Sequence, residues 1–158
     1  MMGRALIFVG AVAVAAFLAA GALGFEASDR GNLRLHLLVG FVSVLLLLLS
    51  QLWILIFLVA SGRAVRRTVE LAGLDPALAT ESRARLRRLA PWLASAVVLT
   101  VATFAVGPQM AGGRAPRWLH AGLAAAALAA QVSALVLERR ELGAHALRLG
   151  ELARTVEV

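Results

Sequence analysis

The chain contains no cysteine and no lysine. The absence of cysteine excludes disulfides, thiolate metal sites, iron–sulfur ligation and thiol nucleophiles. Any metal chemistry therefore depends on histidine, methionine or carboxylate side chains. All 16 basic residues are arginine, and this usage, with abundant alanine, leucine, valine and glycine, is typical of a bacterial protein from a GC-rich genome. The sequence also lacks the patterns of a hydrolase triad, a phosphate loop, a nucleotide-binding fold and a zinc-protease helix.

Charged residues are sparse and lie mainly outside long apolar runs. Hydrophobic residues make up 61% of the 158 residues, and the mean hydropathy is +0.85. A soluble domain of this size cannot bury so much apolar surface, so we expect an integral membrane protein in a lipid bilayer. The net charge of +7 does not indicate nucleic acid here, because the arginines cluster at helix ends. With no charge in mid-membrane, a transporter has little support.

Four apolar runs predict a single all-α domain over residues 1–158, a transmembrane four-helix bundle with up-down-up-down topology. The longest run exceeds the roughly 20 residues that cross a bilayer. The runs cover residues 5–25, 33–61, 91–107 and 118–137. Between the second and third spans, residues 62–90 predict a cytoplasmic helical hairpin, and residues 138–158 predict a cytoplasmic amphipathic tail.

The turn of this hairpin is predicted at Gly73 to Pro76. Glycine is suited to cap the first arm, and Asp75 followed by Pro76 is typical of a helix start. Pro91 is expected to start or kink the third membrane helix. The hairpin's second arm should present its arginines to the cytoplasm as a lipid or partner site or simply as a topology signal: Arg83, Arg85, Arg87 and Arg88.

The remaining connections are expected to be short. A polar turn over residues 26–32 joins the first two spans, and residues 108–117 form a breaker-rich outer loop. In the tail, helical spacing places Leu142, Ala146, Leu149 and Leu152 on the apolar side. His145 lies in this tail and is expected to be solvated.

The arginine distribution predicts the topology. Twelve arginines lie at the N-terminus, in the hairpin or after the fourth span, against four on the opposite side: Arg30, Arg34, Arg114 and Arg117. The positive-inside rule then places both termini in the cytoplasm, in a multi-pass protein of the inner membrane.

His36 and His120 each lie a few residues inside an apolar run that enters from the outer face. Because the second and fourth helices of such a bundle are parallel and diagonal, the two rings should lie at similar depth, facing each other. At about 100° per residue, each histidine shares its face with small or weakly polar residues. These are Gly40, Ser43, Leu47, Ser50 and Gln51 on one helix, and Ala124, Ala127, Gln131 and Ala134 on the other. Such faces leave room for a b-type haem with two axial imidazoles.

Arg34 and Arg117 stand at the mouth of this site and are expected to pair with haem propionates. The alternatives are two interfacial or hydrogen-bonding histidines without a cofactor, a copper or zinc site, or a proton relay. Met110 is the only soft ligand nearby, which disfavours copper. Gln51 and Gln131 lie deeper and are expected to bond to each other or, alternatively, to a quinone-like head group.

In helix count and paired histidines, the chain resembles the small four-helix membrane anchors and b-type cytochromes of bacterial electron-transfer complexes. This resemblance implies an electron-transfer subunit that works with other membrane subunits or copies of itself, rather than an enzyme acting alone. The alternative is a cofactor-free structural or assembly subunit whose working part is the arginine-rich hairpin.

Overall fold

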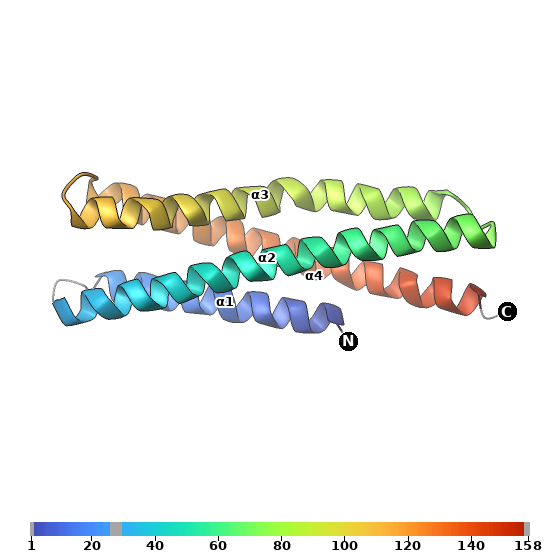
Figure 1. Cartoon of the computed structure of the whole chain (residues 1–158), viewed down its shortest axis with the longest axis horizontal. Coiled ribbons are helices and arrows are strands. Elements are labelled where there is room, and N and C mark those ends of the chain that lie inside the picture. Colours follow the sequence, from blue (N-terminus) through green and yellow to red (C-terminus); the bar gives the residue numbers. More distant parts are fainter. Residues whose placement is uncertain (1, 26–29, 157–158) are drawn as a thin grey trace.

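The computed structural model describes residues 2–25 and 30–156, and within these ranges the chain forms four α-helices. Figure 1 shows them lying along one common long axis. Their bounds are α1 (Met2–Phe25), α2 (Arg30–Ala72), α3 (Ala77–Ala111) and α4 (Arg117–Val156). The predicted all-α four-helix architecture is confirmed. Of the expected polar turn over residues 26–32, residues 26–29 lie outside the described residues.

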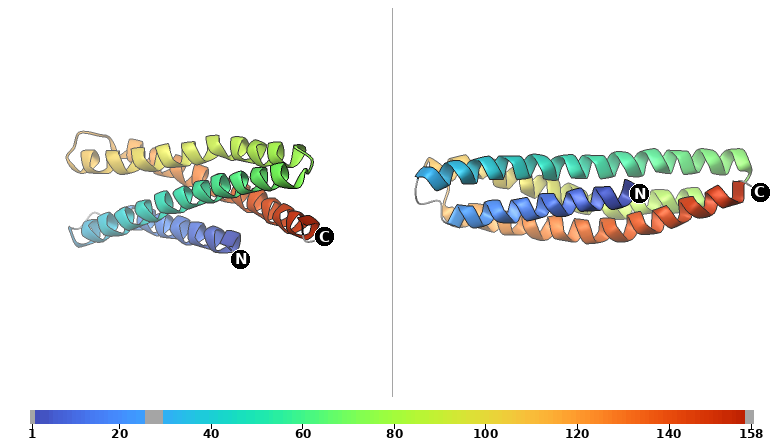
Figure 2. Two further views of the ribbon diagram at one scale, coloured as in Figure 1. Left: turned by 45° about the vertical axis from the view of Figure 1, so that its right-hand side comes forward. Right: turned by 90° about the horizontal axis from the view of Figure 1, so that it is seen from below.

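The helices pack around a ring in chain order. Each of α1, α2 and α3 contacts the next helix, and α4 packs back against α1. Figure 2 shows the four helices lengthwise from two further directions. The helices α2 and α4 therefore occupy diagonal positions, as the sequence predicts, and run in the same direction.

Three of the helices are much longer than the bilayer is thick. The 43 residues of α2 and the 40 of α4 extend for roughly 60 Å, about twice the thickness of the hydrocarbon layer. Helix α1 has only 24 residues, and its start lies part-way along the bundle (Figures 1 and 2). The end that holds the α2–α3 turn thus contains three helices. The predicted hairpin and the predicted tail form one three-helix extension, because α4 continues without a break.

The α2–α3 turn has the expected chemistry. Gly73 adopts φ +62°, the left-handed conformation that glycine tolerates best. The amide of Leu74 donates to the carbonyl of Val69 over 3.0 Å, which is the long bond of a Schellman motif. The amide of Ala77 donates to Asp75 Oδ1 over 2.8 Å. Helix α3 begins one residue after the predicted proline start.

Helix α3 runs through both of its prolines, Pro91 and Pro108. Of the two roles expected for Pro91, a helix start or a kink, the start is therefore excluded, and the loop predicted to begin at Pro108 starts later. A proline already has a helical φ and removes only one amide donor. Within a membrane the other backbone groups still need intrahelical bonds, which favours continuation of the helix. Ser95 Oγ donates to the Pro91 carbonyl over 2.8 Å, as expected for a serine that bonds back to its own helix.

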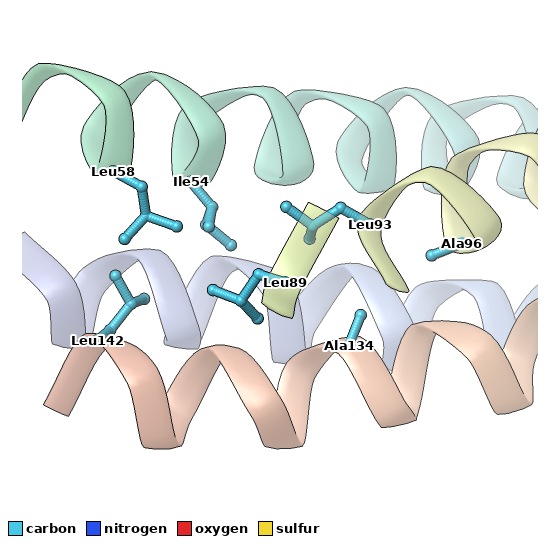
Figure 3. Packing of buried hydrophobic residues seen from close by; sticks show 7 residues of the cluster. All are labelled: Ile54, Leu58, Leu89, Leu93, Ala96, Ala134 and Leu142. Atoms are coloured by element: carbon cyan, nitrogen blue, oxygen red, sulfur yellow. The ribbon is translucent and has the colours of Figure 1, made fainter. Parts of the chain in front are cut away.

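The bundle is apolar outside and mixed inside, which is the pattern of a multi-pass membrane protein. All four helices are long and apolar enough to cross a membrane. Large apolar side chains such as Phe8, Leu38 and Val98 are more than 60% exposed and are suited to contact lipid acyl chains. The largest core cluster packs α2, α3 and α4 together in the half of the bundle nearer the α2–α3 turn (Figure 3). Its members are Ile54, Leu58, Leu89, Leu93, Ala96, Ala134 and Leu142.

Candidate functional site

His36 is held against α1 by a hydrogen bond and a glycine. Its Nδ1 lies 2.8 Å from the carbonyl oxygen of Ala20. A carbonyl only accepts, so Nδ1 carries the proton and Nε2 is left with a free lone pair. One turn further along α1, a Cβ built on Gly24 would lie only 2.9 Å from His36 Cε1. Glycine is therefore needed here for the ring to lie against the neighbouring helix.

His120 repeats this arrangement against α3. A Cβ on Gly107 would lie 3.3 Å from His120 Cε1, and the ring interacts with the backbone of Thr103, one turn before that glycine. Within the described residues, the buried Nδ1 of His120 has no hydrogen-bond partner. In both helix pairs, α1–α2 and α3–α4, the histidine ring thus lies against a glycine of the adjacent helix. Only in the first pair does Nδ1 also form a hydrogen bond to a backbone carbonyl.

The two rings meet across the bundle axis. Their centroids are 6.4 Å apart and their planes are at 87° to each other. Two metal–imidazole bonds of about 2 Å each, added to the two ring radii, roughly match this separation. One metal ion between the rings is therefore compatible with the positions that the helices impose.

The predicted faces below the rings are buried. Ser43, Leu47, Ala127 and Gln131 are each at most 1% exposed. Near His36, a Cβ added to Gly40 would meet no atom within 4 Å. A larger side chain at Gly40 would therefore not collide with its neighbours, and the buried residues below it form a closely packed face.

Arg34 and Arg117 lie at the same end of the bundle as the histidines. Both side chains are exposed, and within the described part of the chain neither has a hydrogen bond or an ion pair. The structure thus places the four predicted site residues at one end of the bundle, with two rings inside and two guanidinium groups at the surface.

Few protein ligands for a metal ion lie together in the part of the chain that the structure describes. Among residues 2–25 and 30–156, no group of three or more histidine, aspartate or glutamate side chains is placed to hold a metal ion. Zinc ordinarily takes three or four protein ligands. A haem iron needs only one or two, because the macrocycle supplies the others.

Deeper in the bundle, the two glutamines bond to each other, as predicted. Gln51 Nε2 donates to Gln131 Oε1 over 2.9 Å, and Gln131 Nε2 donates to Thr100 Oγ1 over 3.0 Å. This chain, which we call the amide chain, connects α2, α4 and α3. Hydrogen bonds between helices pair polar groups inside a membrane bundle, although Gln51 Oε1 has no partner among the described residues.

His145 is not solvated, contrary to expectation. It is 2% exposed, its Nε2 lies 2.8 Å from Ser61 Oγ, and its ring packs edge-on to Phe57. The Ser61 hydroxyl donates to the Phe57 carbonyl over 2.6 Å, so His145 Nε2 is the donor to Ser61. The prediction failed because α4 packs on the hairpin, which turns this side of the tail inward.

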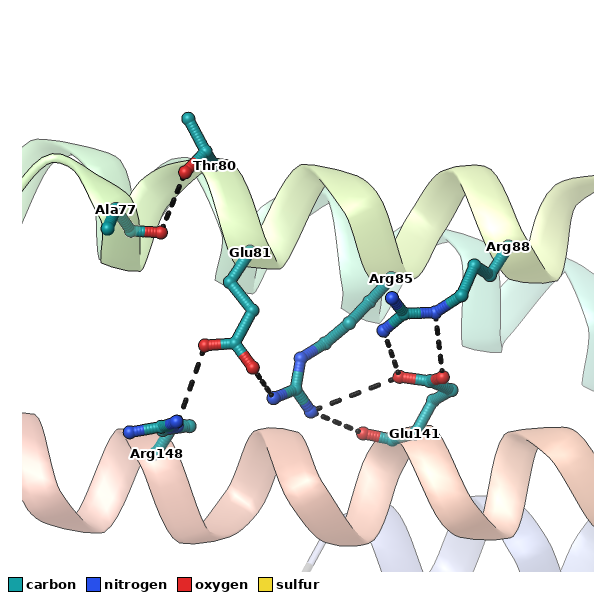
Figure 4. A network of polar contacts seen from close by, with 7 residues as sticks. All are labelled: Ala77, Thr80, Glu81, Arg85, Arg88, Glu141 and Arg148. Atoms are coloured by element: carbon teal, nitrogen blue, oxygen red, sulfur yellow. Dashed lines mark hydrogen bonds and ion pairs between the residues drawn. The ribbon is translucent and has the colours of Figure 1, made fainter.

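One of the four hairpin arginines is buried, so the expectation that all are accessible was wrong for Arg85 (Figure 4). Arg85 is 5% exposed and its guanidinium lies 2.7 Å from Glu81, on its own helix, and 4.0 Å from Glu141 on α4. Arg88 pairs with Glu141 at 3.1 Å and remains exposed. The two pairs with Glu141 join α4 to α3. Arg83, Arg87 and Arg88 are exposed, in line with the prediction.

Sequence reasoning missed Gly24, Gly107 and Glu138. Each glycine precedes its histidine by nearly the same number of residues, a spacing that two adjacent antiparallel helices bring to one level. Glu138 is seven residues beyond Gln131, which is two helical turns on the same face. The sequence prediction nevertheless places it at the start of the polar tail that follows the fourth span. It is 1% exposed.

Function has to be inferred from this geometry. A ligand at this site would meet the rings of His36 and His120 and the exposed arginines at the same end of the bundle. Gly24 and Gly107 hold the place of the two rings. No protein family, curated protein or solved structure matches the chain.

Proposed function

We propose that the protein binds one b-type haem between His36 and His120 and transfers electrons near one face of the membrane, as a subunit of a larger membrane assembly. Arg34 and Arg117 would bind the propionates. The bound iron would supply one-electron redox chemistry. The chain's own residues orient two partly buried imidazoles and offer positive charge at the mouth.

The single observation that carries this proposal is that both histidines pack against a neighbouring helix in the same way. His36 uses Nδ1 for a backbone carbonyl, and each ring rests on a glycine of the adjacent helix. Histidines that ligate metals commonly donate their second nitrogen to a backbone carbonyl or carboxylate, which fixes the ring and frees the other nitrogen. Two unrelated interfacial histidines do not require this shared arrangement at one level.

The experiment is a visible absorption spectrum of protein purified from its own host, with haem in excess. The reduced protein is expected to show the sharp α-band of a low-spin six-coordinate iron. His36→Ala and His120→Ala should each lose it. His145→Gln, which keeps a hydrogen-bonding group near Ser61, should retain it. Retention of haem by both alanine variants would exclude the site.

The arginine count supports an orientation with both termini in the cytoplasm of a bacterial cell and the haem site toward the outer face of the inner membrane. Twelve arginines lie on the termini-and-hairpin side against four on the histidine side. A reporter inserted at residues 112–116 is expected to read as extracytoplasmic, and one at residues 73–76 as cytoplasmic. The reverse result at both positions would overturn the orientation.

The alternative function is a cofactor-free assembly subunit that works through the hairpin. An open groove between the two hairpin arms supports it. Arginines on both arms line this groove: Arg63, Arg66 and Arg83. Arg66 is already paired with Glu70 over 2.7 Å, which leaves the other two for an acidic partner. Complete absence of haem from the purified protein would favour this alternative.

A further inference from the structure

Glu138 is a buried acid without a cation. It lies on the inward face of α4 between Ala134 and Leu142, one turn away on either side, which are core residues with at most 2% exposure. Within the described residues its carboxyl group makes no ion pair, and Oε1 has no hydrogen-bond partner. Burying an unpaired carboxylate in apolar surroundings is costly, and such a group becomes neutral unless a cation compensates it.

Among the side chains that the structure describes, none of the elements packed around Glu138 offers it a compensating charge. On α3, Arg85 and Arg88 are bonded to Glu81 and Glu141. On α4 itself, Arg139 and Arg140 are exposed, and the nearest inward titratable group, His145, bonds to Ser61. The parts of α1 and α2 that pack into this core supply apolar side chains: Leu6, Ile7, Ile54, Phe57 and Leu58.

The amide chain ends beside Glu138 with a missing donor. Gln51 gives an amide proton to Gln131, which gives one to Thr100, so both glutamines donate in the same direction. This leaves Gln51 Oε1 buried without a hydrogen-bond partner. Glu138 is the other side chain that interacts with Gln51. An oxygen of each residue is buried without a hydrogen-bond partner among the described residues, so this contact contains two acceptor atoms that lack a donor.

We infer that Glu138 is a proton-binding site in the bundle core, and that its bound proton is donated to Gln51 Oε1. A carboxylate only accepts hydrogen bonds, whereas a carboxylic acid has one O–H donor. Protonation therefore satisfies the orphaned oxygen of Gln51 and removes the buried charge at the same time. This site is separate from the histidine pair and does not depend on haem.

Proton loss would require the amide chain to reverse. An ionised Glu138 needs a donor, which Gln51 supplies if its amide turns over. Gln131 then has to turn as well and give its amide proton to Gln51 Oε1, and the hydroxyl of Thr100 becomes the donor to Gln131. Each group keeps a partner in both directions because amides and hydroxyls both donate and accept. Occupancy of the proton site on α4 thereby sets the hydrogen-bond direction as far as α3.

The test is infrared spectroscopy of the full-length protein in lipid nanodiscs at neutral pH. Wild type is expected to show the carbonyl band of a protonated carboxylic acid, shifted in deuterated water. Glu138→Gln should lose this band. Glu141→Gln, which removes an ion-paired carboxylate of the same helix, should keep it. Absence of the band from wild type, or its persistence in Glu138→Gln, would overturn the proposal.

A labelling measurement on wild type covers the case in which Glu138→Gln does not fold. An apolar carbodiimide reacts with protonated carboxyl groups in apolar surroundings, so Glu138 should be labelled at least about tenfold more than Glu141, whose carboxylate forms an ion pair with Arg88. Equal labelling would contradict the inference. The Gln51→Leu variant removes the acceptor and is expected to move the carbonyl band to higher frequency. An unchanged band would show that Gln51 does not receive the proton.

Discussion

Replacing Gly24 by valine is expected to abolish haem binding, whereas the same replacement at Gly21 is expected to preserve it. A Cβ at Gly24 would lie 2.9 Å from Cε1 and 3.2 Å from Nδ1 of His36. The ring would have to move away from α1 and would lose its hydrogen bond to Ala20. A misplaced axial ligand cannot complete the six-coordinate iron. The measurement is the haem content per polypeptide, from the reduced absorption spectrum.

Gly21 is the matched control because it lies one turn away on the same helix and a Cβ there would meet no atom within 4 Å. Thermal unfolding of both variants shows whether the fold is kept. Gly107→Val should weaken haem binding less than Gly24→Val does, since its Cβ would lie 3.3 Å from His120. Normal haem content in Gly24→Val would show that His36 is not a ligand in this position.

Arg85→Ala is expected to reduce the free energy of unfolding by roughly 3 kcal/mol, the lower end of the range for removing one partner of a buried ion pair. Arg85 is buried and bonds to Glu81, and it also reaches the backbone carbonyl of Glu141 over 3.3 Å. The lower end applies because each acid keeps a second cation: Glu141 retains Arg88, and Glu81 retains Arg148 at 3.6 Å. Chemical unfolding in detergent measures the change.

Arg87 provides the control for this variant. It lies two residues away on the same helix and is exposed, so Arg87→Ala should change the free energy of unfolding by no more than about 0.5 kcal/mol. If both variants unfold like wild type, the ion pairs of Figure 4 do not hold α4 to the hairpin. In that case the three-helix extension would depend mainly on its apolar contacts: Val65, Val69, Leu74, Leu78 and Leu149.

Where all four helices pack together, the spacing of small and polar residues predicted the buried faces correctly, because each helix there has the same two neighbours along its length. Ser43, Leu47, Gln131 and Ala134 are all buried on the faces predicted for them. Beyond the N-terminus of α1, the same reasoning succeeded only in part. On the predicted apolar side of the tail, Leu142 is buried and Ala146 is exposed. The buried stripe also includes Glu138 and His145, which the prediction left out.

The sequence alone determined the spans, the hairpin turn and the common level of the two histidines. These follow from local properties: run length against bilayer thickness, the left-handed preference at Gly73 and the equal rise of parallel helices. Only the tertiary structure decided which groups meet. A pattern along one helix cannot show that Gly24 supports His36, because the two lie on different helices. Nor can it show that Glu138 faces inward, because that depends on how α4 packs near and beyond the N-terminus of α1.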